Sequence, residues 1–363
     1  MMTTSHPSPG PLPPGKRARY PLLFILLGVL LPLLFAADLL WGTVSVTWAD
    51  LRGLISRLVV PAGELSTNQY LLLHFRLPKT LTALVAGAGI AVSGLLLQNL
   101  FRNPLADASI LGINSGAGLG VAIFTMLGAL FPTWGILTHG ITDNRGVVLA
   151  AAVGALVVLM LILAISARIK DLVSILIIGV MVGFLASALI SVLQYFSSEE
   201  SLKNYLIWSY GSVAGTTWGQ LKILIPVTGV GAAAALCLPK SLNAFSLGNR
   251  YARSLGVNIT LLRLAIVLIT GVLTGCITAF AGPISFLGMA VPQFVRMAFR
   301  TADHRVLLPA SLLSGGLLLL LCDIFTHLPG TQFVLPLNAI TSLIGSPIVI
   351  LTVLRARRAA AHS

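Results

Sequence analysis

Long apolar runs follow one another along almost the whole chain, from Pro21 to Arg355. A helix that crosses a bilayer needs about 20 predominantly apolar residues. Runs of that length, bounded by charged residues, Pro or Gly, predict about ten spans. They cover 21–41, 80–100, 109–131, 146–167, 172–196, 219–238, 264–281, 283–299, 306–328 and 333–354. The pattern therefore predicts an all-α, polytopic membrane protein with about ten transmembrane helices.

The chain has no polar block large enough to form a separate soluble domain, so we expect one membrane domain over 21–355. Residues 1–20 are rich in Pro and Ser and should form a disordered tail, and 356–363 should form a second tail. A cleaved signal peptide is the rival interpretation of the first span, but the run is long for one. Gly282 and Pro283 interrupt the stretch 264–299, which leaves open a tight reversal or a broken helix.

Composition supports a membrane protein. Apolar residues make up 56% of the chain and charged residues 9%, whereas soluble domains have about 25% charged residues. The three cysteines lie far apart inside apolar runs and indicate neither a disulfide framework nor a metal cluster.

The basic residues predict an orientation, because short loops rich in Lys and Arg stay in the cytoplasm. With the N-terminus inside, 16 of the 23 Lys and Arg residues fall on the inner side and seven on the outer side. An even number of spans places both tails in the cytoplasm. The net charge of +13 then reflects topology and does not indicate nucleic-acid binding.

Several kinds of chemistry are absent from the sequence. The Lys-Ser/Thr pairs, at Lys79 and Lys240, follow Pro and do not form a phosphate loop, so the chain is not its own ATPase. Neither metal-binding nor hydrolase motifs occur, so an intramembrane enzyme has little support. Most acidic residues lie at span ends or in loops, whereas a proton-coupled carrier should place some in mid-span. A secondary, ion-coupled transporter of a small solute is kept as the alternative.

Short polar signatures between the apolar runs resemble the FecCD family, the permease subunits of ABC importers for iron-siderophores, haem and cobalamin. The first signatures are Arg76-Leu77-Pro78-Lys79-Thr80-Leu81, Gly87-Ala88-Gly89, Ser93-Gly94, Gln98, Arg102-Asn103-Pro104-Leu105-Ala106-Asp107 and Leu111-Gly112-Ile113-Asn114-Ser115-Gly116-Ala117-Gly118. The later ones are Trp208 with Gly211-Ser212, Ala252-Arg253-Ser254-Leu255-Gly256-Val257-Asn258, Ala281-Gly282-Pro283-Ile284-Ser285-Phe286-Leu287-Gly288, Val291-Pro292, Asp303-His304-Arg305 and Leu343-Ile344-Gly345-Ser346-Pro347. The resemblance extends from about Tyr70 to Arg355.

Three positions depart from the family pattern. The chain has Gln293 where the family usually has His, Asn249-Arg250 where it often has an acidic pair, and Asn338 where it has Gly. The resemblance implies a type II ABC importer permease that forms a homodimer in the bacterial inner membrane. Two copies of an ABC ATPase, which bind the ATP and Mg, and a periplasmic substrate-binding protein are the implied partners. The chain itself is implied to need no cofactor, metal or catalytic residue.

The loop of about 240–263 is the longest polar interruption in the second half, and Asn249 to Leu255 can form a short helix ended by Gly256. The residues alone leave open a helix held at the lipid surface. The resemblance implies a coupling helix seated in the ATPase. The residues implied to carry the coupling are Asn249, Arg250, Ala252, Arg253, Ser254, Leu255 and Gly256.

Arg76 and Lys79 are predicted near the outer end of the second span, where both could extend to the lipid interface. The resemblance implies instead that they receive the binding protein's carboxylates. His327, near the outer end of the ninth span, is implied to add a contact that is weak or sensitive to pH.

Asn103 and Leu105 are implied to gate the cytoplasmic mouth of the pathway, or simply form a turn before an Asp107 helix cap. The pathway wall should be smooth and weakly polar. The residues of the fifth span that fit such a wall, or equally helix packing, are Ser187, Ser191, Gln194 and Tyr195.

Overall fold

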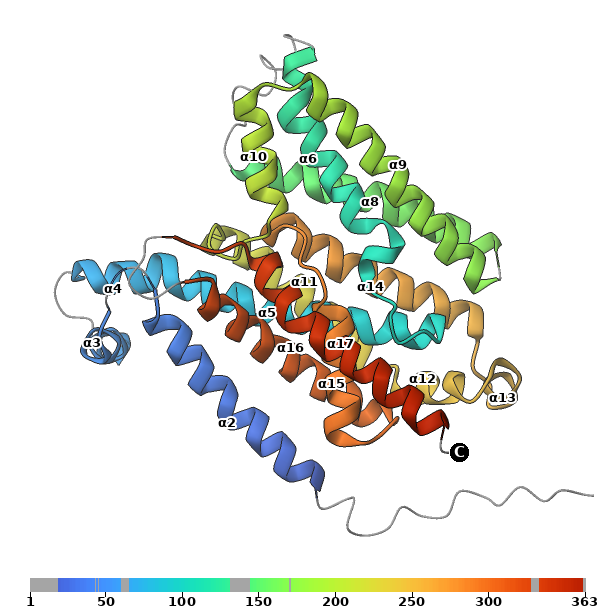
Figure 1. Ribbon diagram of the computed structural model, residues 1–363. Helices are drawn as coiled ribbons and strands as arrows, with labels where there is room; N and C mark the ends of the chain where they lie inside the picture. Colours follow the sequence, from blue (N-terminus) through green and yellow to red (C-terminus); the bar gives the residue numbers. More distant parts are fainter. Residues whose placement is uncertain are drawn as a thin grey trace, which may run out of the picture.

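The computed structural model describes residues 19–42, 44, 46–59, 65–130, 144–169, 171–327 and 333–361. Most of the described chain is helical (Figure 1). The long helices are α2 (Arg19–Leu40), α5 (Leu77–Phe101), α6 (Ile113–Leu130), α8 (Asn144–Arg168), α9 (Leu172–Phe196), α11 (Trp218–Leu236), α14 (Ile259–Ala281), α15 (Leu287–Phe299), α16 (His304–Thr326) and α17 (Leu337–Ala361). The shorter ones are α3 (Trp48–Val59), α4 (Thr67–Leu71), the π-helical turn η1 (Leu72–Arg76), the 3-10 turn η2 (Ala108–Leu111), α10 (Glu199–Ser209), α12 (Pro239–Ser246) and α13 (Asn249–Ser254).

Each predicted span coincides with one of the long helices, so the predicted all-α membrane fold is confirmed. Seven helical stretches of the described chain are long and apolar enough to cross a bilayer, and α6 and α17 contain shorter apolar stretches. The exception in length is α15, whose 13 residues extend about 20 Å at 1.5 Å per residue. This helix is too short to cross a hydrocarbon core of about 30 Å by itself.

The long helices alternate in direction, which gives the bundle two ends. α12 and α13 lie at one end, together with the start of α2 and the end of α17, and α3 and α4 lie at the other (Figure 1). We name these the α13 end and the α4 end. α17 continues to Ala361, past the predicted boundary of the membrane domain at Arg355. Most of the predicted tail 1–20 lies outside the described residues.

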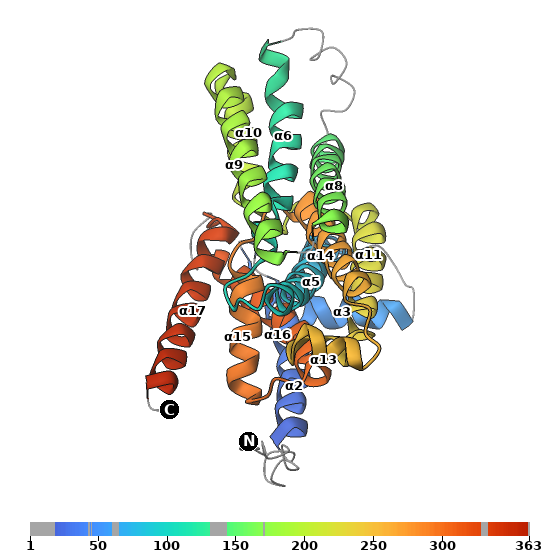
Figure 2. The same cartoon turned by 90° about the vertical axis from the view of Figure 1, so that its right-hand side faces the viewer.

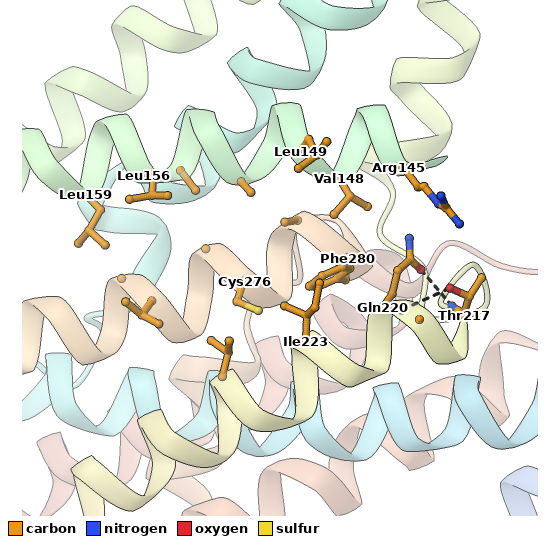
Figure 3. A pocket seen from close by; sticks show the side chains of 18 residues that line it. Arg145, Val148, Leu149, Leu156, Leu159, Thr217, Gln220, Ile223, Cys276 and Phe280 are labelled. Carbon is orange, nitrogen blue, oxygen red and sulfur yellow. Dashed lines mark hydrogen bonds between the residues drawn. The ribbon is translucent and has the colours of Figure 1, made fainter. Parts of the chain in front are cut away.

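Seen from the α13 end, α6, α8 and α9 form one flank of the bundle and α2, α15 and α17 form the other (Figure 2). α14 lies between the flanks, and both α8 and α11 pack on it. A groove of about 690 Å³ lies between α8 and α11, over α14 (Figure 3).

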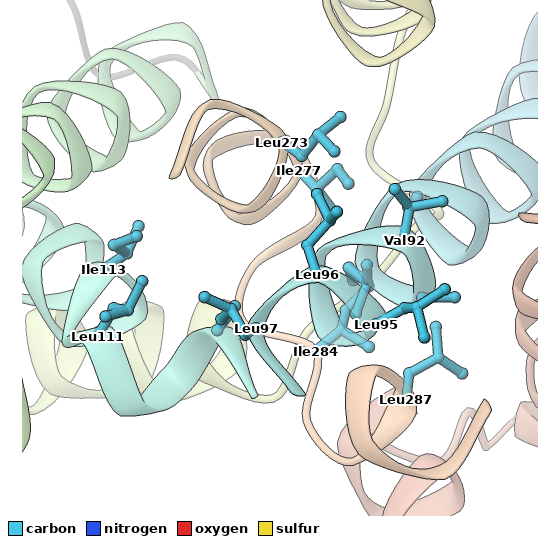
Figure 4. Close-up of a cluster of buried hydrophobic side chains, with 14 of the residues drawn as sticks. Val92, Leu95, Leu96, Leu97, Leu111, Ile113, Leu273, Ile277, Ile284 and Leu287 are labelled. Atoms are coloured by element: carbon cyan, nitrogen blue, oxygen red, sulfur yellow. The ribbon is translucent and has the colours of Figure 1, made fainter. Parts of the chain in front are cut away.

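α5 occupies the middle of the bundle and packs against α11, α14, α15 and α16. With α4 and η1 it forms a continuous helical stretch, Thr67–Phe101, of 35 residues. Leu95, Leu96 and Leu97 are fully buried among apolar side chains of α14, of α15 and of the turn before α6 (Figure 4). The helices around α5 therefore share one apolar core.

Glycines set the closest approaches of α5 to its neighbours. A Cβ on Gly87 would overlap the Gly315 carbonyl oxygen of α16, and one on Gly94 would overlap the Gly288 carbonyl oxygen of α15. Small residues allow such close contact between membrane helices, where van der Waals packing drives association. These glycines are therefore part of the scaffold.

The interruption between α14 and α15 is a tight reversal. Gly282 and Phe286 both have positive φ, +71° and +66°. The side chain of Asn338 accepts a hydrogen bond from the Ser285 N–H at 3.0 Å and donates one to the Ser209 carbonyl oxygen at 3.2 Å. Irregular backbone at membrane depth must find partners within the protein. Asn338, one of the departures from the family pattern, supplies two of them.

Candidate functional site

The short helix predicted in the loop 240–263 is present as α13, which ends one residue before the expected limit of Leu255. Gly256 follows with a φ of +79°, a left-handed conformation that suits glycine. The sequence did not predict α12, which precedes α13 and packs on it. Together, α12 and α13 form a compact helical pair at the α13 end.

One face of this pair is apolar and uncovered. Leu247, Tyr251 and Leu255 are spaced four residues apart and are 70%, 49% and 58% exposed. Arg250, Arg253, Ser254 and Gly256 are also exposed, and Asn249 is half-buried. Ala252 is fully buried and points into the protein. Six of the seven predicted coupling residues are thus at least partly accessible, whereas Ala252 packs into the protein. Their role in coupling stays a prediction.

A polar network, buried at Asn99 and His304, connects α12 to α5 and α16. The Asn99 side-chain amide donates to the Ser246 hydroxyl oxygen at 2.7 Å and lies 3.0 Å from His304 Nε2. His304 Nδ1 lies 2.7 Å from the side-chain oxygen of Asn243. These partners fit a neutral imidazole with its proton on Nδ1. The side-chain amide of Asn243 also donates to Asp303 at 2.6 Å, so one chain of bonds joins three helices.

Arg102 adds a second fastening from the end of α5. Its guanidinium donates to the Phe245 carbonyl oxygen at 3.0 Å and to the Asn249 side chain at 3.3 Å. The same group lies 5.3 Å from the centre of the Phe245 ring, within the range of a cation–π contact. Any displacement of α12 and α13 therefore acts on α5 directly.

The signature Asp303-His304-Arg305 leaves open either a helix cap by Asp303 or a contact with the ATPase, and Asp303 does cap α16. It accepts a hydrogen bond from the Arg305 N–H at 2.9 Å. The second role stays a prediction.

The loop after α5 carries the predicted gate residues. Asn103 is half-buried and its side-chain oxygen accepts from the Leu105 N–H at 3.0 Å, whereas Leu105 is 42% exposed. The amide of Gln293 holds this loop to α15 by donating to the Pro104 carbonyl oxygen at 3.0 Å. The turn is therefore present, and gating by Asn103 and Leu105 stays a prediction.

Asp107 closes the same loop and caps η2, accepting from the Ala108 N–H at 2.7 Å. Its side chain is buried and lies against Gly288, where a Cβ would collide with it. Burial raises the pKa of Asp107 to about 6, although hydrogen bonds from Ala108 and Ser109 lower it. The predicted cap is thus also a carboxyl group whose charged form is disfavoured.

At the α4 end, Lys79 lies in a cluster of ionisable groups that the sequence did not reveal. Its ammonium is 2.8 Å from Asp323 of α16 and 3.8 Å from Asp38 of α2. Asp38 also accepts a hydrogen bond from the Thr80 hydroxyl at 2.6 Å. The three charged side chains are between 0% and 9% exposed. The cluster joins α2, α5 and α16.

Arg76 and His327 lie beside this cluster. Arg76 is 7% exposed and its guanidinium donates to the carbonyl oxygens of Leu39, Leu40 and Val44. Burial, followed by the charge of Lys79, lowers the pKa of His327. Docking by Arg76, Lys79 and His327 stays a prediction, but the two cations are already bound, so a carboxylate would have to displace existing partners.

The predicted wall residues lie along the open side of α9. Ser187, Ser191 and Tyr195 are exposed, Tyr195 to 84%, and Gln194 is half-buried. The spacing of four between Ser187, Ser191 and Tyr195 puts them on one face of the helix. Their role in a pathway stays a prediction.

The residues that the sequence analysis missed are paired across long separations. Asp38 and Asp323 lie three and five residues inside the outer ends of their predicted spans, whereas Lys79 lies one residue outside the predicted span 80–100, so the predicted bounds do not align the three. Asn99, Asn243 and Asn338 likewise carried no signal of their partners. Among the described residues, no group of three or more His, Cys, Asp or Glu is placed to hold a metal ion.

Comparison with known proteins agrees with this architecture. The sequence model of the FecCD transport family matches residues 30–355. Vitamin B12 import system permease protein BtuC of Klebsiella pneumoniae is 35% identical, over 82% of this chain and 87% of its own length. The protein of the same name from Escherichia coli O9:H4 is 36% identical, over 82% and 86%. A solved metal-chelate type ABC transporter in an inward-facing conformation superimposes with a TM-score of 0.79 and 30% identity, covering 93% of this chain and 100% of that one.

Proposed function

Because the chain belongs to the FecCD transport family and is an ABC importer permease, we propose that its solute is an iron chelate, either an iron-siderophore or haem, or cobalamin. The vitamin B12 relatives and the metal-chelate type neighbour support this class of large, chelated solutes. The open face of α9, with hydroxyl and aromatic groups between apolar ones, suits a weakly polar wall for such a solute.

The proposed assembly is a homodimer in the bacterial inner membrane, with both termini in the cytoplasm. Two copies of an ATPase, which bind the ATP and Mg, contact the α13 end. A periplasmic binding protein delivers the solute at the α4 end. The observation that carries the proposal is the group of exposed apolar side chains in and beside α13, namely Leu247, Tyr251 and Leu255. A small apolar face on a firmly anchored helix fits a socket on another protein.

In this mechanism the chain performs no bond chemistry. ATP binding and hydrolysis in the partner shift the equilibrium between inward-open and outward-open forms, because the partner contacts the two forms differently. Asn243 and Arg102 belong to the contacts that pass a displacement of α12 and α13 to α5 and α16.

Uptake into proteoliposomes tests the proposal. The chain, its ATPase and its binding protein should together accumulate one of a ferric siderophore, haem or cobalamin, and only when ATP is supplied. Uptake by the chain alone under an ion gradient would contradict the proposal and favour the secondary transporter.

Leu255→Asp tests the coupling face. The variant places an unpaired charge in an apolar socket, which is strongly unfavourable, so ATP-driven uptake should fall at least tenfold while membrane insertion stays normal. Thr260→Asp is the matched control, since this exposed position in the first turn of α14 favours an acidic residue. Normal uptake by Leu255→Asp would refute the socket.

A further inference from the structure

The groove between α8, α11 and α14 is apolar along its length and polar at one end. Leu149, Leu156, Ile223 and Phe280 are among the side chains that line it, and Arg145 is the single charged residue among the described ones in its lining. Arg145 lies at the same end of the groove as Thr217 and Gln220 (Figure 3). An elongated apolar space with a cation at one end matches the shape and charge of a phospholipid.

The polar end has hydrogen-bond donors to offer. Within the described residues, Arg145 is exposed and has no carboxylate partner. The side-chain oxygen of Gln220 accepts from the Thr217 N–H at 3.0 Å, which orients the amide and leaves its N–H groups for a further acceptor. Guanidinium and amide donors suit the oxygens of a phosphate group.

The depth of the groove matches one leaflet. Its lining extends from Arg145 to Leu159 along α8 and from Thr217 to Val227 along α11, about 21 Å and 15 Å of helix. Half of a hydrocarbon core is about 15 Å. Trp218, whose indole N–H donates to the Leu73 carbonyl oxygen at 2.9 Å, lies beside the polar end. Tryptophan is enriched at the headgroup level, where this end is expected to lie.

The small residues of α14 explain why the groove exists. A Cβ on Gly271 would collide with Leu159, and one on Gly275 would lie 3.2 Å from the Ala155 side chain. α8 therefore packs closely on α14 at Gly271 and Gly275, and these two residues contribute no side chain to the floor of the groove. An apolar groove with Arg145 at one end suits an acyl chain and its phosphate, and a helix of a second copy is the occupant that the test below distinguishes from it.

We propose that this groove binds one anionic phospholipid, with an acyl chain along α14 and the phosphate at Arg145 and Gln220. The site is separate from the α9 and α13 faces, so it does not depend on the proposed function.

Lipid retention by the purified full-length chain tests the proposal. Native mass spectrometry would compare dioleoylphosphatidylglycerol with dioleoylphosphatidylcholine added to the detergent-solubilised protein. Wild type should prefer the anionic lipid, and Arg145→Gln should lower its binding roughly fivefold, the effect of one basic residue near an anionic surface. Lys222→Gln, which removes an exposed cation outside the groove, should leave the preference unchanged.

A second pair of variants tests the acyl site. Ile223→Trp fills the groove and should reduce the binding of both lipids several-fold, whereas Ile225→Trp, two residues along the same helix and outside the lining, should not. Equal lipid binding by wild type, Arg145→Gln and Ile223→Trp would overturn the proposal. Loss of a dimer in Ile223→Trp with unchanged lipid binding would overturn it too, and would assign the groove to a second copy.

Discussion

Replacing Lys79 by Met should destabilise the folded chain more than neutralising either neighbouring carboxylate. The ammonium lies 2.8 Å from Asp323 and 3.8 Å from Asp38. At an effective dielectric constant of about 20, Coulomb's law gives attractions of roughly 6 and 4 kcal/mol at these distances. Desolvation of the buried groups offsets part of that sum. Removing one partner of a buried pair costs about 3–5 kcal/mol, and we expect a loss of that size for Lys79→Met.

The carboxylate variants should lose less stability than Lys79→Met. Asp323→Asn leaves Lys79 with Asp38, so its cost should be smaller. The double variant Lys79→Met/Asp323→Asn should be more stable than Lys79→Met alone, because only one carboxylate then remains without a cation. Interaction energies between residues in direct contact make the two effects non-additive.

The apparent melting temperature of the full-length chain in detergent, read from the loss of monodisperse protein after heating, measures these differences. Lys222→Met, on the exposed surface of α11, is the control for loss of a lysine. The reasoning fails if the melting temperature of Lys79→Met equals that of Lys222→Met. It also fails if the double variant lowers the melting temperature by the sum of the two single decreases.

The folded fraction of Lys79→Met also tests docking, because an unchanged affinity for the binding protein would end the docking assignment for Lys79.

Two further changes probe single polar side chains. Asn338→Ala leaves the Ser285 N–H and the Ser209 carbonyl without their partner, so it should lower stability by about 2 kcal/mol; an unchanged melting temperature would contradict this. Because the folded-state pKa of Asp107 is raised to about 6, folding stability should fall as pH rises from about 4 to about 6. Asp107→Asn should lack this fall, and the same pH profile in both proteins would exclude Asp107 as its source.

The helices were predictable because their signal is local. Apolar length alone located the spans, Gly256 marked the end of α13, and Asp303 marked the start of α16. The length of the central helix was not predictable in the same way. His74, Arg76 and Lys79 interrupt the apolar run, so the second span was predicted to begin near Thr80, whereas the helix begins at Thr67.

The partners of the polar groups were harder to predict, because they depend on packing between distant segments. Lys79 is 244 residues from Asp323 in the sequence, and nothing near either residue indicates the other. The role of Asn338 follows only from the irregular backbone that it satisfies. A site built from such pairs becomes visible only when the helices are in place, which is why the burial of Arg76 and Lys79 was not predicted.

The two polar clusters connect α5 to its neighbours, one cluster near each end of the helix, an arrangement that suits coupling between the two membrane surfaces. Lys79 joins it to α2 and α16 at one end, and Asn99 joins it to α12 and α16 at the other. The 20 residues between them extend about 30 Å, the thickness of the hydrocarbon core. Within that length Gly87 of α5 and Gly315 of α16 bring the two backbones into close contact. A displacement of α12 and α13 should therefore move α5 and α16 as one unit, so that a change at the ATPase-facing end reaches the opposite membrane surface through a rigid pair.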